Sequence, residues 1–151
     1  MKVTIEEPMQ GEKIIKIMRP IKFRGIGIEI KRWVYGAYVP AIDEDCCDSI
    51  IDEQGTWHIV FSETVGQYTG LKDKKGAMIF EGDILLLSDG KSHSEDVVVE
   101  HGLYGWTFYN PQTATFYSDG SHTYVAVENC RFMFGTGVVI GNIHDNPDLL
   151  K

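Results

Sequence analysis

Short segments in which apolar and polar residues alternate, or in which β-branched and aromatic residues cluster, recur along the whole chain. This pattern is typical of β-strands that bury one face. The segments expected to form strands are 13–18, 21–23, 28–39, 57–61, 84–87, 97–100, 106–109, 124–127 and 138–143. Turn signals about every ten residues favour a small barrel or sandwich over parallel βαβ units. We therefore predict a mainly β protein with few or no long helices.

Glycine, asparagine and aspartate mark the expected turns between these strands. Glycine tolerates positive φ, and the aspartate side chain bonds to the backbone of its own turn. The positions expected to bend the chain are Gly25, Gly27, Gly36, Gly70, 73–76, Gly82 and 88–90. Near the end of the chain, Asn146 is followed by Pro147, which fits an N-cap with proline at the first helical position. We expect a single helical turn there.

The segment 41–55 is acidic and only weakly apolar. A mobile loop is the first interpretation, and a short helix over 46–51 is the alternative. No repeat or low-complexity tract occurs in the chain. The acidic stretch 43–53 is therefore the one candidate seam between an N-terminal β layer and a C-terminal part.

The length and composition of the chain are typical of one soluble folded domain. The chain has 151 residues, of which 43% are hydrophobic and 24% are charged. A domain of this length needs no disulfide or metal to stabilise its core. No apolar run approaches the roughly 18 residues of a membrane span, and the first residues contain no signal-peptide core. The three cysteines Cys46, Cys47 and Cys130 cannot all pair, which favours a reducing cytoplasm.

Charge is distributed unevenly along the chain. Lysine and arginine total 14 against 22 acidic residues, for a formal net charge of −8. Basic residues are concentrated before position 33, and an acidic run follows at 43–53. Because nucleic-acid backbones are bound by clustered lysine and arginine, only the early segment is suited to them. The candidate basic patch comprises Lys22, Arg24, Lys31 and Arg32, with Trp33 and Tyr35 available for base stacking. The alternative is an ordinary solvated surface of mixed charge.

The sequence lacks the usual motifs for catalysis or metal binding. Cys46 and Cys47 are adjacent, whereas structural zinc ligands are usually two to four residues apart, and the five histidines have no ligand spacing. No serine lies in a G-x-S-x-G elbow. The run GTGVVIG at 135–141 leads into a strand rather than a helix, unlike a dinucleotide fingerprint. The acidic residues Glu81, Asp83, Asp89, Glu95 and Asp96 fit turn polarity as well as acid–base chemistry. We expect no cofactor, no metal and no enzymatic activity.

Aromatic residues are dense between positions 104 and 124. Exposed aromatic side chains commonly mark partner surfaces. The interaction candidates are Tyr104, Trp106, Tyr109 and Tyr117. The alternative interpretation assigns them to the core or to a subunit interface.

Three segments, in order, resemble the YopX family of phage and prophage proteins. The first is IKFRG at 21–25, and the second is QYTGLKDKKG at 67–76, continued by Ile79 and by EGDI at 81–84. The third is VIGNI at 139–143, followed by Asn146-Pro147 and Leu149-Leu150. Residues 1–20 are an extension outside the usual pattern, Ile26-Gly27 replaces a Trp-Asp pair, and Lys75 stands where asparagine is frequent.

The resemblance implies a phage or prophage origin in a bacterium. It also implies an N-terminal β part at 21–62 packed on a small barrel of the SH3 type at 63–146, within one YopX-like domain at 21–150. The family has no assigned activity, cofactor or catalytic residue to transfer. Its motif residues are interpreted as structural: Gly70, Asp73, Gly76, Glu81, Gly82, Asp83, Gly141 and Asn142.

Two hypotheses of function follow. The first is a non-enzymatic protein of the bacterial cytoplasm that binds a host or phage protein or assembles with itself, because small β units often cover their edge strands by assembly. The second is a nucleic-acid-associated accessory factor that uses the basic patch. An uncharacterised hydrolase is a weaker third hypothesis, and no membrane partner is expected.

Overall fold

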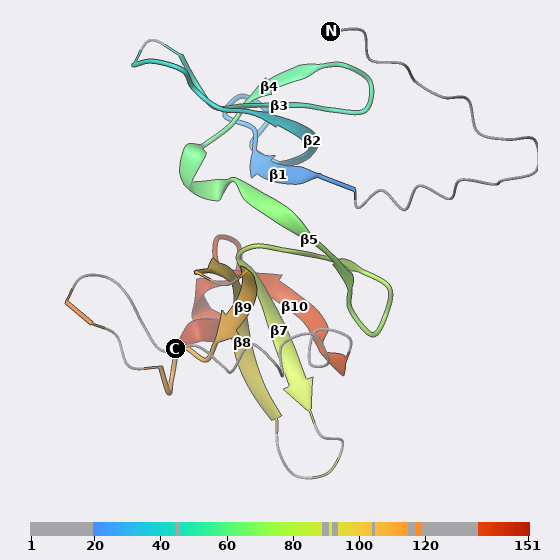
Figure 1. Ribbon diagram of the computed structural model, residues 1–151, viewed down its shortest axis with the longest axis vertical. Helices are drawn as coiled ribbons and strands as arrows, with labels where there is room; N and C mark the ends of the chain where they lie inside the picture. Colours follow the sequence, from blue (N-terminus) through green and yellow to red (C-terminus); the bar gives the residue numbers. More distant parts are fainter. Residues whose placement is uncertain are drawn as a thin grey trace, which may run out of the picture.

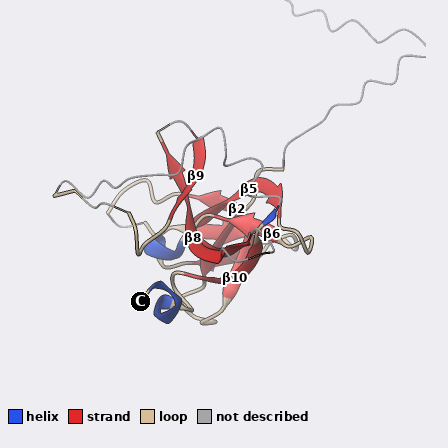
Figure 2. Cartoon of the chain, turned by 90° about the horizontal axis from the view of Figure 1, so that it is seen from below, coloured by secondary structure: helices blue, strands red, loops and turns tan. Residues whose placement is uncertain are grey.

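The computed structural model describes residues 20–44, 46–88, 91, 94–103, 105–114, 117–118 and 136–151. Within these residues, ten strands form two antiparallel sheets. The first sheet has the order β4-β3-β2-β1-β5-β6 and the second the order β10-β7-β8-β9. In Figure 1, β1 to β4 lie in the upper part of the molecule and β7 to β10 in the lower part, with β5 running between them. The prediction of a mainly β protein is confirmed (Figure 2).

The first sheet is an antiparallel meander extended by a hairpin. Its strands are β1 (Phe23–Ile26), β2 (Trp33–Val39), β3 (Ser49–Ile51), β4 (Trp57–Ile59), β5 (Gly66–Lys72) and β6 (Met78–Phe80). Arg24 of β1 lies opposite Tyr35 of β2, and β5 pairs with the other edge of β1. The buried core of this sheet consists of Val34, Ile50 and Val60. A 3-10 helix at Ser62–Thr64 connects β4 to β5.

The predicted strand at 28–39 is five residues too long, because the chain turns tightly before Trp33. The amide of Lys31 donates to the carbonyl of Gly27, and the amide of Gly27 donates to the carbonyl of Arg32. Lys31 has a φ of 53°. The same turn contacts β4, because the amide of Ile28 donates to the carbonyl of Ile59. The backbone at Ile28 thus bonds to the end of β4 instead of continuing β2.

Three strands, β3, β5 and β6, were not predicted. β3 lies within the acidic segment 41–55, where we expected a loop or a helix over 46–51. Ile50 is wholly buried there, between Tyr38 of β2 and His58 of β4. Residues 66–72 and 78–80, predicted as a turn-rich region, form the β5–β6 hairpin, with an irregular register between Tyr68 and Lys72. Each of β3 and β6 has only three residues, too few to show a period.

The second sheet is built on β7 (Asp83–Ser88), which pairs with β8 (Ser94–Gly102) and β10 (Val138–Asn142). The strand β9 (Gly105–Tyr109) pairs with β8. Leu85, Leu87 and Phe108 belong to the buried core on one face of this sheet. Ile84 points to the opposite side and is also wholly buried. The four strands match the predicted segments 84–87, 97–100, 106–109 and 138–143 to within a few residues at each end.

The β5–β6 hairpin belongs to both halves of the molecule. Its backbone pairs with β1 of the first sheet, whereas Leu71 and Ile79 pack into the core of the second. The predicted barrel is not found among the described residues, where the strands of the C-terminal half form an open sheet. The predicted strands at 13–18 and 124–127 lie outside the described residues.

The chain ends in the predicted helical turn, a 3-10 helix at Pro147–Leu150 with proline in its first turn. Asn146 stands at the N-cap, but its side chain makes no capping bond. Instead, its Oδ1 accepts a hydrogen bond from the amide of Asn142 at 3.2 Å. The described helices include none that is long and apolar enough to cross a membrane.

Candidate functional site

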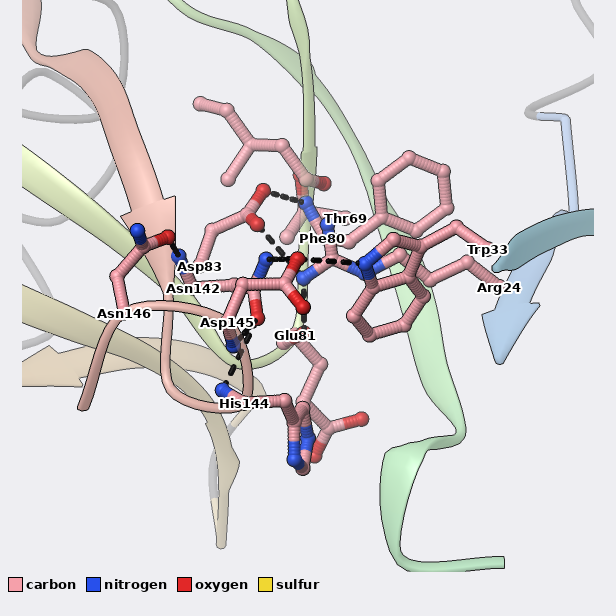
Figure 3. Close-up of polar contacts among 11 residues, drawn as sticks. Arg24, Trp33, Thr69, Phe80, Glu81, Asp83, Asn142, His144, Asp145 and Asn146 are labelled. Carbon is pink, nitrogen blue, oxygen red and sulfur yellow. Dashed lines mark hydrogen bonds and ion pairs between the residues drawn. The ribbon is translucent and has the colours of Figure 1, made fainter. Parts of the chain in front are cut away.

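An ion pair lies between the two sheets. Arg24 of β1 and Asp83 of β7 are 2.6 Å apart between Nη2 and Oδ1, and their side chains are 8% and 2% exposed. The guanidinium carbon is 4.6 Å from the ring centroid of Trp33 and 5.0 Å from that of Phe80. Nη2 also donates to the carbonyl of Glu81 at 3.1 Å. Figure 3 shows these groups gathered around the guanidinium. Aromatic faces suit a desolvated arginine because their ring quadrupole attracts the cation.

The environment of Asp83 opposes its ionisation. Burial raises the pKa of this carboxyl, while the charge of Arg24 and the backbone amide of Phe80 act against that rise. The Phe80 amide donates to Oδ2 at 2.8 Å. Arg24 is therefore the group that makes a charged Asp83 tolerable between the sheets.

The loop after β10 is tied to β2 beside this ion pair. The indole Nε1 of Trp33 donates to Oδ2 of Asp145 at 2.7 Å, and Nδ2 of Asn142 donates to the same oxygen at 2.9 Å. The Oδ1 of Asn142 in turn accepts from the amides of His144 and Asp145. The bonds from Asn142 and Trp33 lower the pKa of Asp145. Burial and the nearby charge of Arg24 lower the pKa of His144, whose ring lies 5.9 Å from that of Trp33.

Asp73 fastens the β5–β6 turn to β10. Its Oδ1 accepts from the amides of Lys75 and Ala77, both at 2.8 Å, and its Oδ2 accepts from the amide of Val139 at 2.9 Å. Burial raises the pKa of Asp73, but the backbone donors outweigh it and hold the pKa below its ordinary value. One carboxylate thus connects segments that are distant in the sequence.

The residues of the three family-like segments converge on these contacts. Arg24, Asp83 and Asn142 belong to the cluster between the sheets, and Asp73 lies beside β10. Gly70, Gly76 and Gly82 have positive φ, and Gly82 lets the chain turn from β6 into β7. Gly141 lies against the side chain of Asn146, where a Cβ would collide. Glu81 contributes its carbonyl to Arg24. All of these contacts hold segments of the chain together.

A cleft of about 810 Å³ opens beside the ion pair, and we call it the inter-sheet cleft. Ile30, Trp33 and Tyr35 contribute to its lining from the first hairpin, and Met78 and Phe80 from β6. Arg24 and Asp83 also line it. A ring contact of 5.6 Å between Tyr35 and Phe80 joins β2 to β6 across the sheet.

Charged and polar side chains of the inter-sheet cleft contact one another. Lys22 Nζ forms an ion pair with Glu53 Oε1 at 2.9 Å, and His58 Nε2 is hydrogen-bonded to Asp52 Oδ2 at 2.8 Å. The hydrogen bond from His58 is the largest contribution that lowers the pKa of Asp52. The remaining basic residue of the lining is the exposed Arg32, for which no ion pair is found among the described residues.

The structure separates the four residues of the candidate basic patch. Lys22, Arg24 and Arg32 line the cleft, but Lys22 is paired and Arg24 is buried. Lys31 points elsewhere, with its Nζ 4.9 Å from the ring centroid of Phe61. A continuous row of free cations, which a phosphate backbone would need, does not form among these residues.

The aromatic interaction candidates also differ in placement. Trp106 is half-buried against the core of the second sheet, with its ring 4.9 Å from that of His101. Tyr109 is half-buried and lines a smaller cavity of about 200 Å³. Tyr117 is 55% exposed, and Tyr104 lies outside the described residues. The position of Trp106 thus agrees with the core interpretation. The side chain of Tyr117 is exposed to solvent and is available for contact.

Sequence reasoning missed the most exposed apolar residues of the first sheet. Trp57 is 61% exposed and Ile59 is 46% exposed, on the same face of β4. Together with Ile30 and His58, they line a small hollow of about 130 Å³ that shares these last two residues with the inter-sheet cleft. The alternation of Trp57 and Ile59 predicts a common face, but not that this face is the open one.

The remaining candidates for chemistry are dispersed. Within the described ranges, no group of three or more histidine, cysteine or acidic side chains could hold a metal ion. Cys46 and Cys47 are exposed free thiols, and Cys130 and Asp89 lie outside the described residues. Glu95 accepts a hydrogen bond from Asn110, and it lies at the opposite end of β7 from Asp83.

The fold and the cleft define a mainly β protein in which two antiparallel sheets are joined by a buried arginine–aspartate pair. The family profile described as YopX protein matches residues 22–151, and the chain therefore belongs to the YopX family. This confirms the resemblance of the three segments. Among solved structures, the chain is similar to the crystal structure of protein EF1440 from Enterococcus faecalis. That similarity has 26% identity and a TM-score of 0.48, and it covers 87% of this chain and 99% of the other. Curated proteins gave no match.

Proposed function

We propose that this member of the YopX family is a non-enzymatic protein-binding module, and that the inter-sheet cleft receives a segment of its protein partner. The observation that carries the proposal is the combination of a cleft of about 810 Å³ with partly exposed apolar walls and a floor of neutralised charge. Apolar surfaces with a few placed polar groups are typical of binding sites. The partner is a host or phage protein in the bacterial cytoplasm, and the phage or prophage origin is the one that the family resemblance implies.

Three apolar side chains make the walls available for contact. Ile30 and Met78 are each 37% exposed, and Tyr35 is 39% exposed. They come from the β1–β2 turn, from β6 and from β2. Side chains that are half-covered on a rigid sheet lose little conformational entropy on binding, which favours affinity. The neighbouring hollow around Trp57 extends this apolar surface beyond the cleft.

The pairing of charges argues against the nucleic-acid alternative. Arg24 and Lys22 already have acidic partners, and Glu53, Asp52 and Asp83 place negative charge within the same lining. A phosphate backbone approaching this surface meets carboxylates as well as cations, and the chain carries a net charge of −8.

Site-specific photocrosslinking tests the proposal in cells that carry the phage or prophage. A photoreactive phenylalanine analogue replaces Met78 in the cleft or, as a matched control, Ile140 of β10, which is also 37% exposed. We expect the probe at position 78 to capture a defined protein, identified by mass spectrometry, and the probe at position 140 to capture none. An excess of the purified partner should then reduce crosslinking from position 78. Equal labelling at both positions, or none at position 78, would refute the proposal.

Two finer proposals accompany this one. The C-terminal half forms a small barrel of the SH3 type, as the family resemblance implies, and an experimental structure will test this. The molecule also assembles with itself through the exposed face of β4 that carries Trp57 and Ile59. A crosslink from position 78 to a second copy, together with a concentration-dependent mass in light scattering, would identify the partner as the protein itself.

A further inference from the structure

Arg32 differs from the other basic residues of the inter-sheet cleft. Lys22 and Arg24 have carboxylate partners within the lining, whereas Arg32 is exposed and has no ion pair among the described residues. Arg32 directly precedes Trp33, which packs on Arg24, and its carbonyl accepts from the Gly27 amide, so its backbone is held in the tight turn. The guanidinium thus extends from a fixed point beside the apolar walls.

We infer, on the basis of the proposed function, that the cleft recognises an acidic peptide segment in which a glutamate or aspartate lies next to a large apolar residue. Arg32 binds the carboxylate, and the surface formed by Ile30, Tyr35 and Met78 takes the apolar side chain. An arginine fork fits a carboxylate with two parallel hydrogen bonds, which fixes the register of the segment. Lys22 and Arg24 are already paired with Glu53 and Asp83, so Arg32 is the cation of the lining that is left for the carboxylate of this ligand.

A protein segment fits this arrangement better than a nucleic acid. One free guanidinium neutralises one charge, which is sufficient for a single carboxylate, whereas a single-stranded nucleic acid brings a phosphate with every nucleotide. Asp52 and Glu53 line the same cleft and would repel the additional phosphates. The apolar walls also favour a ligand that brings an uncharged side chain next to its anion.

Selection from a library of displayed random peptides against the full chain tests the ligand class. We expect enriched sequences with an acidic residue beside a phenylalanine, tyrosine, leucine or methionine. Binding of one synthetic enriched peptide is then measured with the wild type, Arg32→Gln and the control Lys75→Gln, which removes an exposed charge from the β5–β6 turn. Arg32→Gln should weaken binding about tenfold or more, as expected for loss of a charge-assisted contact. Lys75→Gln should leave binding unchanged.

Charge reversal makes the assignment specific. Arg32→Glu should abolish binding of the acidic peptide, and replacing the peptide's acidic residue by lysine should restore part of it. Because Arg32 is exposed, we expect the Arg32 variants to unfold at the same urea concentration as the wild type. Unchanged urea midpoints show that the loss of binding does not result from unfolding.

The outcomes separate this inference from the proposed function. If Tyr35→Ala abolishes peptide binding but Arg32→Gln does not, the cleft is still a binding site. The inference that its ligand is acidic would then be wrong. The absence of any cleft-binding peptide, together with negative crosslinking at position 78, would overturn both. Tight binding of oligo-dT that disappears with Arg32→Gln would assign the site to nucleic acid instead.

Discussion

Arg24 of β1 and Asp83 of β7 form an ion pair that joins the two sheets of the protein, with 2.6 Å between Nη2 and Oδ1. The two residues come from different family-like segments, IKFRG and EGDI. Both side chains are buried, so water contributes little to their solvation. The cost of placing either charge alone at this position is therefore high.

Removing one member of the pair should cost more than removing both. We expect Arg24→Met or Asp83→Leu to lower the free energy of unfolding by about 3–5 kcal/mol, because each leaves an uncompensated buried charge. The double variant should be more stable than either single variant, since no buried charge remains. Urea unfolding of all four proteins gives the coupling energy directly. Additive losses in the double variant would show that the two side chains do not act as a pair.

The hydrogen bonds of Asp73 should make stability depend on pH in the acidic range. Backbone donors hold the pKa of Asp73 below its ordinary value of 3.8, so the folded state favours the carboxylate. The resulting stabilisation is complete above the unfolded pKa and is lost as the pH falls through the folded pKa. We expect Asp73→Asn to be about 1–3 kcal/mol less stable at neutral pH, because one oxygen acceptor is lost. This difference should shrink as the solution is acidified below the ordinary pKa.

Urea unfolding at a series of pH values measures the effect of Asp73→Asn. The control is Asp148→Asn in the C-terminal turn, where the carboxylate is exposed and pairs with Lys151. Its curve should follow that of the wild type. A constant difference between Asp73→Asn and the wild type at all pH values would contradict the role given to the ionised carboxylate.

The indole of Trp33 should act on Asp145 through one hydrogen bond. Trp33→Phe keeps a ring against Arg24 but removes the Nε1 donor, which lies 2.7 Å from Asp145 Oδ2. The pKa of Asp145 should therefore rise, because Asn142 remains as a side-chain donor but Trp33 does not. NMR titration of the Asp145 carboxyl measures this shift. The stability should fall by about 0.5–1.5 kcal/mol. Trp57→Phe, at an exposed position on β4, should change neither quantity.

The parts of the fold that could be predicted are those in which local pattern and tertiary structure agree. The run DILLLS of β7 and the segment VVIGN of β10 are apolar enough to be recognised as strands. β3 could not be recognised, because only Ile50 and Ile51 distinguish it within an acidic segment, and the burial of Ile50 depends on Tyr38 and His58 in neighbouring strands.

The candidate site was predictable only in part. Lys22, Arg24 and Arg32 were recognised as basic, but a sequence does not show that Arg24 is buried, because its partner Asp83 belongs to a distant segment. Only the nucleic-acid hypothesis assigns Trp33 and Tyr35 to base stacking; in the structure Trp33 packs on Arg24 and Tyr35 on Phe80. The cleft itself arises from the pairing of β2 and β6 with β1 and β5, and this topology has no local signal.

The close approach of β2 to β3 at Gly36 should make this position intolerant of any side chain. A Cβ on Gly36 would collide with the backbone carbonyl oxygen of Ile51, and backbone in a paired strand cannot move aside as a flexible side chain can. We expect Gly36→Ala to lower the free energy of unfolding by about 3 kcal/mol or more. The matched control is Gly55→Ala, where φ is 81° but no atom lies within 4 Å of the added Cβ. Its backbone strain should cost only about 1–2 kcal/mol. Urea unfolding compares the two variants, and a loss at Gly36 no larger than the loss at Gly55 would contradict the clash between the strands.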